Sequence, residues 1–266
     1  MLFPFISLPL PQVADGFTVQ YKRVASEVRY QFRGQMLTVY AGAIDAPPSR
    51  AIDLAGTLVL RTEQRPGSRW VVVAITDGIK ATRGGKAVPK EESNLAFKGT
   101  WTQTVGGSAT YTAKGLAVLP VAFNAPLWPL AWTPIAADKG MKVGEVWSSI
   151  FSLPAQAFLE DDPIGWFGVP LNFVFNGQDP INKNLYSISL KTSHEFKDPV
   201  RHPEAKDLVL TGSVLVDGRI KTRKDDGRLE SANVIFSFDI GLTSDAYEFG
   251  FSKARGSVTA VLDRIE

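Results

Sequence analysis

The two histidines of the chain, His194 and His202, lie in one segment, SHEFKDPVRHPEAKD, together with several carboxylates. Two imidazoles and a carboxylate can hold a divalent metal, and histidine is the usual general acid or base of enzymes. Alternation along a strand places His194 and Glu195 on opposite faces, however, and the spacing matches no established metal motif. The run 198–203 contains two prolines and is typical of an exposed loop. We therefore expect no metal site here.

A second group of chemically capable residues is the acidic run Glu160, Asp161 and Asp162 in LEDDPIGWFG. A glycosidase needs two carboxyl groups at a defined separation, and a run of adjacent acids does not provide it. A short helix followed by a turn at Pro163 explains the run as well. The sequence contains no Gly-x-Ser-x-Gly elbow and no Gly-x-x-x-x-Gly-Lys-Ser/Thr loop. We expect no catalytic residue and no cofactor.

The composition excludes other classes of protein. Lys and Arg number 29 against 27 Asp and Glu, which leaves a formal charge of +2, and the basic residues are scattered along the chain. A nucleic-acid partner is therefore not expected. Cysteine is absent, so disulfides and thiolate sites are excluded while the compartment stays open. With 44% hydrophobic residues in 266, the chain can bury a full core.

The elements that would position any site are strands. Aromatic and β-branched residues recur at every second position in short runs bounded by Gly, Pro, Asp and Asn, and no helical period is sustained. DDGR at 225–228 and VDGR at 216–219 predict hairpin turns, and a short helical turn is expected at 154–161. The candidate strands are 17–24, 27–33, 36–41, 55–63, 69–76, 95–104, 108–113, 171–176, 184–196, 207–216, 219–223, 228–239, 246–252 and 256–264.

Two segments share an aromatic-x-Phe-x-Gly-Gln pattern, YQFRGQ at 30–35 and FVFNGQ at 173–178. They indicate either an internal repeat or two sheets that independently need an aromatic strand ending in Gly. We expect an all-β fold of two similar antiparallel curled sheets or half-barrels joined by a crossover rich in Pro and Trp. The expected divisions, which can also form one continuous domain, are an arm at 1–16, a first β half at 17–119, the crossover at 120–150 and a second β half at 151–266.

The crossover contains APLWPLAWTPIAADKGMKVGEVW at 125–147, whose three prolines forbid central strand pairing. Its tryptophans either close the seam between the two halves or contact a ligand. Trp147 is expected to be a buried anchor of the second half. The residues expected to bind a ligand, if one is bound, are Phe123, Trp128, Trp132 and Trp166.

The arm begins MLFPFISLPLPQ, which is apolar but punctuated by three prolines. It is too short to span a bilayer and lacks a basic leader, so we expect no transmembrane segment and an export signal already removed. An extended apolar segment can lie along a sheet edge of its own subunit or of a neighbour. The expected partner-binding residues of such self-association are Phe3, Phe5, Leu8 and Leu10.

The segments KVGEVWSS at 142–149 and DDGRLESANVIFSF at 225–238 resemble uncharacterised exported bacterial β-rich proteins, in which a Val-Gly-(Asp/Glu)-x-Trp segment opens the second half. The resemblance implies an exported β scaffold in the periplasm or at the cell surface, and no catalytic residue. In architecture the plan is distantly similar to the lipoprotein carriers of the bacterial envelope, which hold acyl chains in a half-closed barrel.

These observations favour an exported, non-catalytic binding protein, with an apolar small molecule or a lipid as its ligand. A structural or assembly subunit of the cell envelope or of a surface fibre is the first alternative, because of the apolar arm. A hydrolase acting on an envelope polymer, through the acidic run or the histidine segment, is the second.

Overall fold

The computed structural model describes ten parts of the 266-residue chain, and all its regular elements are strands. The expected all-β class is therefore confirmed. The helical turn expected at 154–161 starts on the last residue of a strand and otherwise falls outside the described residues. The described residues are 17–18, 24–41, 50–66, 69–88, 100–104, 109–111, 140–154, 166–199, 206–245 and 253–265.

Six of the strands have 15 or 16 residues, which corresponds to a length of about 50 Å. The strands are β1 (Phe17–Thr18), β2 (Ser26–Ala41), β3 (Arg50–Arg65), β4 (Arg69–Arg83), β5 (Lys86–Ala87), β6 (Thr100–Thr104), β7 (Ala109–Tyr111), β8 (Gly140–Met141), β9 (Val146–Pro154), β10 (Trp166–Gln178), β11 (Leu185–Pro199), β12 (Val209–Arg223), β13 (Leu229–Thr243) and β14 (Lys253–Arg264).

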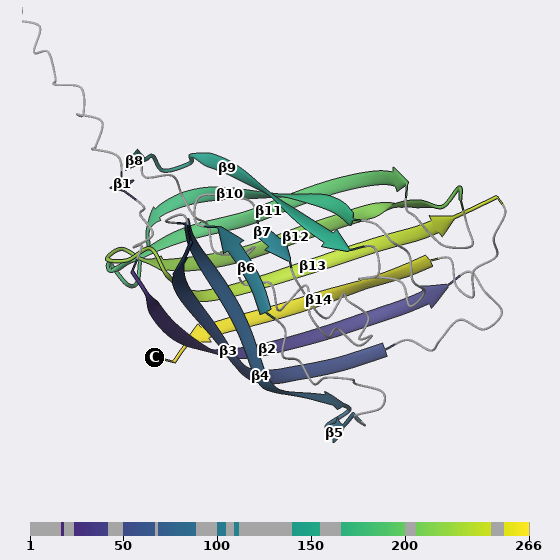
Figure 1. Ribbon diagram of the computed structural model, residues 1–266, viewed down its shortest axis with the longest axis horizontal. Helices are drawn as coiled ribbons and strands as arrows, with labels where there is room; N and C mark the ends of the chain where they lie inside the picture. Colours follow the sequence, from purple (N-terminus) through teal and green to yellow (C-terminus); the bar gives the residue numbers. More distant parts are fainter. Residues whose placement is uncertain are drawn as a thin grey trace, which may run out of the picture.

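The described strands other than β1 and β8 form one sheet that closes on itself (Figure 1). Its order is β3-β2-β14-β13-β12-β11-β10-β9-β7-β6-β4-β5, and a further pairing of β3 with β4 completes the ring. The short strands β1 and β8 pair with each other in a separate two-stranded sheet. Closure reduces the open sheet edges that would otherwise present unpaired backbone groups, although among the described residues β7 and β9 pair at one position only.

Each half of the chain supplies a contiguous arc of this ring, β2 to β7 from the first half and β9 to β14 from the second. The arcs meet at two seams. At one seam β14 and β2 form a long antiparallel ladder from Lys253–Ala41 to Arg264–Tyr30. At the other, β7 and β9 are parallel and pair at Ala109–Phe151. The two half-barrels expected from the sequence are thus arcs of a single closed sheet.

Alternation along the strands divides inner from outer positions. In β12, Val214, Val216 and Ile220 are buried, while Asp217 and Arg219 between them are exposed. The same period of two runs through β11 and β13, so the apolar side chains of neighbouring strands meet inside the closed sheet. The largest fully buried side chains are Tyr30, Phe32, Leu58, Phe173, Phe175 and Ile188.

One of the two predicted hairpin turns is wrong. Residues 216–219 continue β12 without a turn, and Gly218 lies opposite Val234 of β13. A Cβ atom on Gly218 would lie 2.9 Å from Val234 Cγ2, so this glycine permits a close approach of two strands rather than a turn. The turn at 225–228 is confirmed, because the Gly227 amide donates to the Arg223 carbonyl at 3.0 Å just before β13 begins.

Candidate functional site

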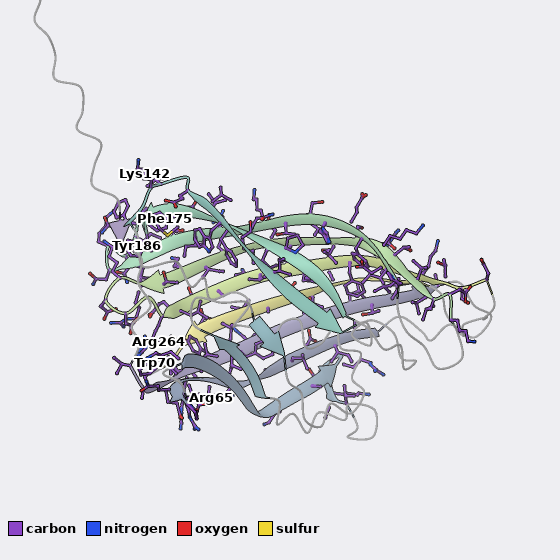
Figure 2. The ribbon with its side chains drawn as sticks, turned by 45° about the horizontal axis from the view of Figure 1, so that its top comes forward. Arg65, Trp70, Lys142, Phe175, Tyr186 and Arg264 are labelled. Carbon is purple, nitrogen blue, oxygen red and sulfur yellow. The ribbon has the colours of Figure 1, made fainter. Side chains whose placement is uncertain are left out.

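One end of the closed sheet, here named the β1 end, brings together the turns at 142–145, 179–184 and 224–228 and the last residues of β14. Figure 2 shows Trp70, Lys142, Phe175, Tyr186 and Arg264 at this same end. Segments that are far apart in the sequence therefore converge there, which makes it the best candidate for a site among the described residues.

An aromatic cluster lies at the β1 end. Phe17 of β1 packs edge-on against Phe175, with ring centroids 5.6 Å apart, and against Tyr186 at 5.9 Å. Phe175 and Tyr186 also pack edge-on against each other at 5.3 Å. Such geometry places the positive ring edge on the negative ring face, which favours this arrangement over a face-to-face stack. Burial raises the pKa of the Tyr186 phenol, and Lys224 Nζ lies 5.3 Å from its ring centroid.

Backbone contacts fix Phe175 in this cluster. Its carbonyl accepts a hydrogen bond from the Gly144 amide at 2.7 Å, and its amide donates to the Glu145 carbonyl at 2.9 Å. Immediately after Phe175 the register of β10 against β11 shifts, and Gly177 adopts a φ of 86°. After this bulge the ladder continues for two more pairs and then leads into the turn that begins at Asp179.

The turn at 179–184 is organised by one carboxylate. Asp179 Oδ1 accepts hydrogen bonds from the amides of Ile181 at 3.0 Å and Asn182 at 2.8 Å, and Oδ2 lies 3.0 Å from Lys221 Nζ. The Asn182 amide and, next, the Lys221 ammonium hold the pKa of Asp179 below its ordinary value, because both favour the ionised form. Asp179 therefore joins the end of β10 to β12.

Trp147 of β9 stacks on Phe173 of β10, with ring centroids 5.4 Å apart and ring planes 16° from parallel. Phe173 is buried on the inner face, so the Trp147 ring also lies on that face. Trp147 itself is half-buried, so the expectation of a buried anchor is only partly met. Trp147 lies on the strand that borders the second seam, where β7 and β9 pair at a single position among the described residues.

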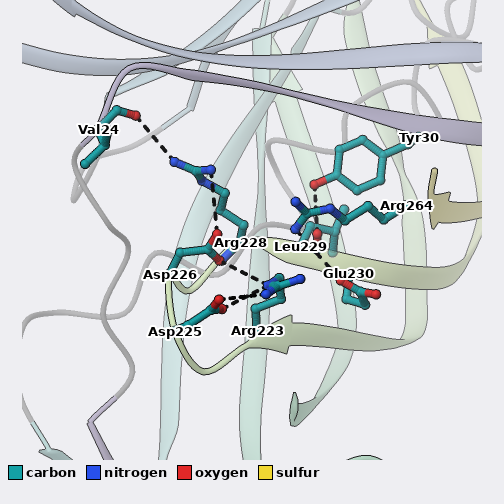
Figure 3. A network of polar contacts seen from close by, with 9 residues as sticks. All are labelled: Val24, Tyr30, Arg223, Asp225, Asp226, Arg228, Leu229, Glu230 and Arg264. Atoms are coloured by element: carbon teal, nitrogen blue, oxygen red, sulfur yellow. Dashed lines mark hydrogen bonds and ion pairs between the residues drawn. The ribbon is translucent and has the colours of Figure 1, made fainter. Parts of the chain in front are cut away.

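A polar network also lies at the β1 end (Figure 3). The Tyr30 hydroxyl donates to the Leu229 carbonyl at 2.8 Å. Arg264 Nη1 lies 3.9 Å from Glu230 Oε2, and Arg228 Nη1 lies 3.6 Å from Asp226 Oδ2. These four charged side chains are largely buried, with exposed fractions from 12% for Arg228 to 34% for Glu230. Buried charges of this kind need partners.

The turn that carries this network is closed by a further ion pair. Arg223 Nη2 donates to Asp225 Oδ2 at 2.6 Å and Arg223 Nε to Oδ1 at 2.9 Å. The Arg223 guanidinium lowers the pKa of Asp225 to about 2, and Asp225 in turn raises the pKa of Arg223. This bidentate pair is more exposed than the inner network and holds the turn between β12 and β13 in place.

Most residues predicted to form a site are not among the described residues. Phe123, Trp128 and Trp132, the arm residues Phe3, Phe5, Leu8 and Leu10, and also Glu160, Asp161, Asp162 and His202 fall outside the described residues. Trp166 is the first residue of β10 and pairs with Pro154. Because β10 ends at the β1 end with Gln178, Trp166 marks the opposite end of the sheet.

The histidine of the described residues is part of a strand. His194 in β11 is half-buried and stacks on Phe196 with ring centroids 6.2 Å apart, while Glu195 is exposed on the other face. No group of three or more His, Cys, Asp or Glu side chains that could hold a metal occurs within the described ranges. Over the same ranges no helix is long and apolar enough to cross a membrane.

The sequence interpretation missed Tyr30, Glu230 and Arg264. A signal was present for Arg264, because it continues the alternating apolar positions Val258, Ala260 and Leu262 and should therefore face inward. No comparable signal exists for Glu230. Its position depends on an irregularity of register between β12 and β13, where Lys221 and Thr222 are adjacent but pair with Ser231 and Leu229.

Comparison with known proteins gives no family. No family model matches the chain, and no curated protein matches it. Among solved structures, DynF from the dynemicin biosynthesis pathway of Micromonospora chersina is similar at 8% sequence identity, over 97% of this chain and 92% of that one, with a TM-score of 0.27. A similarity at this TM-score supports no conclusion about function.

Proposed function

We propose that this protein is a non-catalytic binding protein that holds an apolar ligand against the inner face of the closed sheet near the β1 end. The observation that carries the proposal is Trp147. Its ring lies on the inner face, stacked on the fully buried Phe173, and yet Trp147 keeps accessible surface. A large aromatic side chain that faces inward and is incompletely covered is a common feature of sites for apolar molecules.

The distribution of polarity supports the same function. The inner positions of β11, β12 and β13 are occupied mainly by Leu, Ile, Val and Phe, and the outer positions between them mainly by Ser, Lys, Arg, Asp and Glu. Closed antiparallel sheets of more than eight strands can enclose ligands. An apolar molecule therefore finds more complementary surface on the inner face of these strands than on their outer face.

Displacement of an apolar fluorescent dye tests the proposal. The unmodified protein should bind the dye, and an added long-chain hydrocarbon should displace it. Trp147→Ala should weaken dye binding by about 10- to 150-fold, because truncating a large aromatic contact removes roughly 1.5–3 kcal/mol.

The matched control is Val146→Ala. Val146 precedes Trp147 on β9 but points outward and is 59% exposed, so this variant should bind the dye like the parent. Failure of the parent protein to bind the dye contradicts the proposal. Equal weakening by both variants contradicts it as well, since the site would then not be on the inner face.

Export to the periplasm or cell surface belongs to the same proposal and is supported by the resemblance of residues 142–149 described above. In the structure this segment forms the turn at 142–145 and the start of β9. Fractionation of the producing cell, with detection by antibody, should place the protein outside the cytoplasm. Recovery from the cytoplasmic fraction alone would contradict it.

A further inference from the structure

Exposed aliphatic side chains gather at the β1 end. Of the large hydrophobic side chains that are exposed among the described residues, six lie within strands. The four others lie in turns or beside strand ends, all at the β1 end, and are Val24, Val143, Ile181 and Ile265. Single exposed apolar residues need no explanation, but several at one end of a molecule indicate an interaction surface.

Ile181 is the most exposed of these side chains, with 89% of its surface accessible. The turn that carries it is nevertheless well ordered by hydrogen bonds. Asp179 Oδ1 accepts from the amides of Ile181 and Asn182, and Gln178 Nε2 donates to the Lys183 carbonyl at 2.6 Å. The turn therefore holds the Ile181 side chain out into solvent in a defined position.

Direct contacts join this turn to its neighbours. The Lys224 amide donates to the Asn184 carbonyl at 3.0 Å, so the hairpin ends of β10–β11 and β12–β13 lie side by side (Figure 1). On the other side, Val143 covers the bulge before the turn, because a Cβ atom on Gly177 would lie 2.9 Å from Val143 Cγ2. We name the three joined turns the three-turn surface, which consists of residues 142–145, 179–184 and 224–228.

The three-turn surface carries an excess of positive charge. Each of its aspartates already has a basic partner, Lys221, Arg223 or Arg228. Its glutamate, Glu145, accepts a hydrogen bond from the Lys142 amide at 3.0 Å. Three ammonium groups form no ion pair with a carboxylate of the described residues, and they belong to Lys142, Lys183 and Lys224. The surface therefore suits an anionic partner.

The combination of aliphatic and basic side chains selects the kind of anionic partner. A soluble polyanion would pair with the lysines but would leave Ile181 and Val143 in water. At the surface of an anionic bilayer, aliphatic side chains enter the boundary between headgroups and acyl chains, while lysine ammonium groups stay at the level of the phosphates. A projecting turn with Ile181 at its tip also fits a deformable lipid interface better than a rigid protein face.

We propose that the three-turn surface docks this protein onto an anionic lipid bilayer. Ile181 and Val143 enter the interface, and the three lysines contact the headgroup phosphates. The inference goes beyond the proposed function and does not depend on it, because docking involves the outside of the turns and no ligand inside the sheet.

Sedimentation of the full chain with lipid vesicles tests the proposal. One set of vesicles contains phosphatidylcholine alone, and the other contains equal parts of phosphatidylcholine and phosphatidylglycerol. The anionic vesicles should bind at least about tenfold more tightly, since each lysine near such a surface contributes about fivefold, and added salt should weaken this binding. Equal binding to both vesicles, or to neither, would overturn the proposal. Tighter binding to soluble polyglutamate than to the anionic vesicles would assign the surface to an acidic protein instead.

Two variants separate the aliphatic from the ionic contribution. Ile181→Ser should weaken binding to the anionic vesicles by about tenfold or more and keep the preference for them, because it removes the burial of one large aliphatic side chain. Lys183→Gln should weaken the same binding by about fivefold and reduce its salt dependence. Both side chains are exposed, so both variants should unfold at the parent's temperature. Unchanged vesicle binding in Ile181→Ser would overturn the proposal.

The matched controls are Leu215→Ser and Lys191→Gln. Leu215 on β12 and Lys191 on β11 are exposed on the outer face of the sheet, away from the turns. Both variants should bind the anionic vesicles like the parent. Equal weakening by Leu215→Ser and Ile181→Ser would contradict the proposal, because the bilayer would then contact the side of the sheet and not the three-turn surface.

Discussion

The segments YQFRGQ on β2 and FVFNGQ on β10 have the same pattern and opposite directions in the closed sheet. Five antiparallel pairings separate them. Phe32 and Phe175 consequently lie in one cross-strand row, joined through Leu262, Ala232, Ile220 and Ile188. Their glycines occupy different places. Gly177 lies near the β1 end of the sheet, whereas Gly34 lies in the cross-strand row of Phe173, which is further from that end.

The difference shows that position in the sheet decides what a pattern does. Gly177 has a φ of 86° and forms a bulge from which the chain enters the turn at Asp179. Gly34 continues a regular ladder, and a Cβ atom there would lie 2.8 Å from Phe32 Cζ. Phe32 and Phe175 are both buried core residues, whereas Gly177 allows a bulge and Gly34 allows close packing against Phe32.

The largest effect should come from the shared aromatic row. Phe32→Ala and Phe175→Ala should each lower the free energy of unfolding by about 3–5 kcal/mol, because both rings are fully buried and truncation leaves a cavity. Leu37→Ala, on the outer face of β2 and 46% exposed, should change it by less than about 1 kcal/mol. Denaturant titration measures all three. A difference of more than about 2 kcal/mol between the two Phe variants would show that the rings do not share one core.

The two glycines give the next largest effect. Gly177→Ala should lower the free energy of unfolding by about 1–2 kcal/mol through backbone strain at positive φ. Gly34→Ala should lower it by about 1–3 kcal/mol through displacement of the Phe32 ring. Combining each with Phe32→Leu separates the two mechanisms in a double-mutant cycle. Coupling is expected for Gly34 and not for Gly177, and additive costs at Gly34 would refute the packing explanation.

Tyr30 and Phe173 occupy corresponding positions of the two segments, but only Tyr30 carries a hydroxyl. Tyr30→Phe removes the hydrogen bond to the Leu229 carbonyl and should lower the free energy of unfolding by about 1 kcal/mol. Phe173→Leu serves as the comparison, because it changes only the packing at the corresponding position, where no side-chain hydroxyl is present. Thermal unfolding is the measurement, and an unchanged melting temperature in Tyr30→Phe would mean that the bond does not contribute.

The smallest effect depends on pH. The folded-state pKa of Asp179 is lowered, so its contribution to stability is present above its unfolded-state pKa of about 3.9 and is lost as the pH falls through the folded-state value. Asp179→Asn should therefore be less stable than the parent at neutral pH and should show a shallower loss of stability below about pH 4. Parallel stability curves for parent and variant from pH 2 to 6 would contradict this role.

The sequence predicts the strands well because alternation is a local signal. Burial of Phe173 and Phe175 follows directly from their spacing, and the turn at 225–228 follows from its Asp-Gly dipeptide. Closure of the sheet does not follow, because it depends on pairings such as β2 with β14 that join residues more than two hundred positions apart. The network of Arg264 and Glu230 could not be predicted for a different reason, because the position of Glu230 depends on the irregular register between β12 and β13.

The misassigned turn at 216–219 has a related cause. Asp-Gly is a strong local signal for a hairpin, and here it is overridden by the close approach of β13 to Gly218. The second misassignment concerns which tryptophans contribute to the proposed site. The tryptophan that carries the proposed site is Trp147, which was interpreted as core, whereas Trp166 of the predicted ligand set lies toward the other end of β10.

The central claim, that an apolar ligand binds to the inner face, is tested most directly by photo-crosslinking with a diazirine-bearing hydrocarbon and identification of the labelled residues by mass spectrometry. We predict labels on inner-facing residues of the β1 end, foremost Trp147, and their loss when excess 1-dodecanol is added. Labels confined to the outer-facing residues Val146 and Ile150 of the same strand, which are 59% and 61% exposed, would contradict the claim.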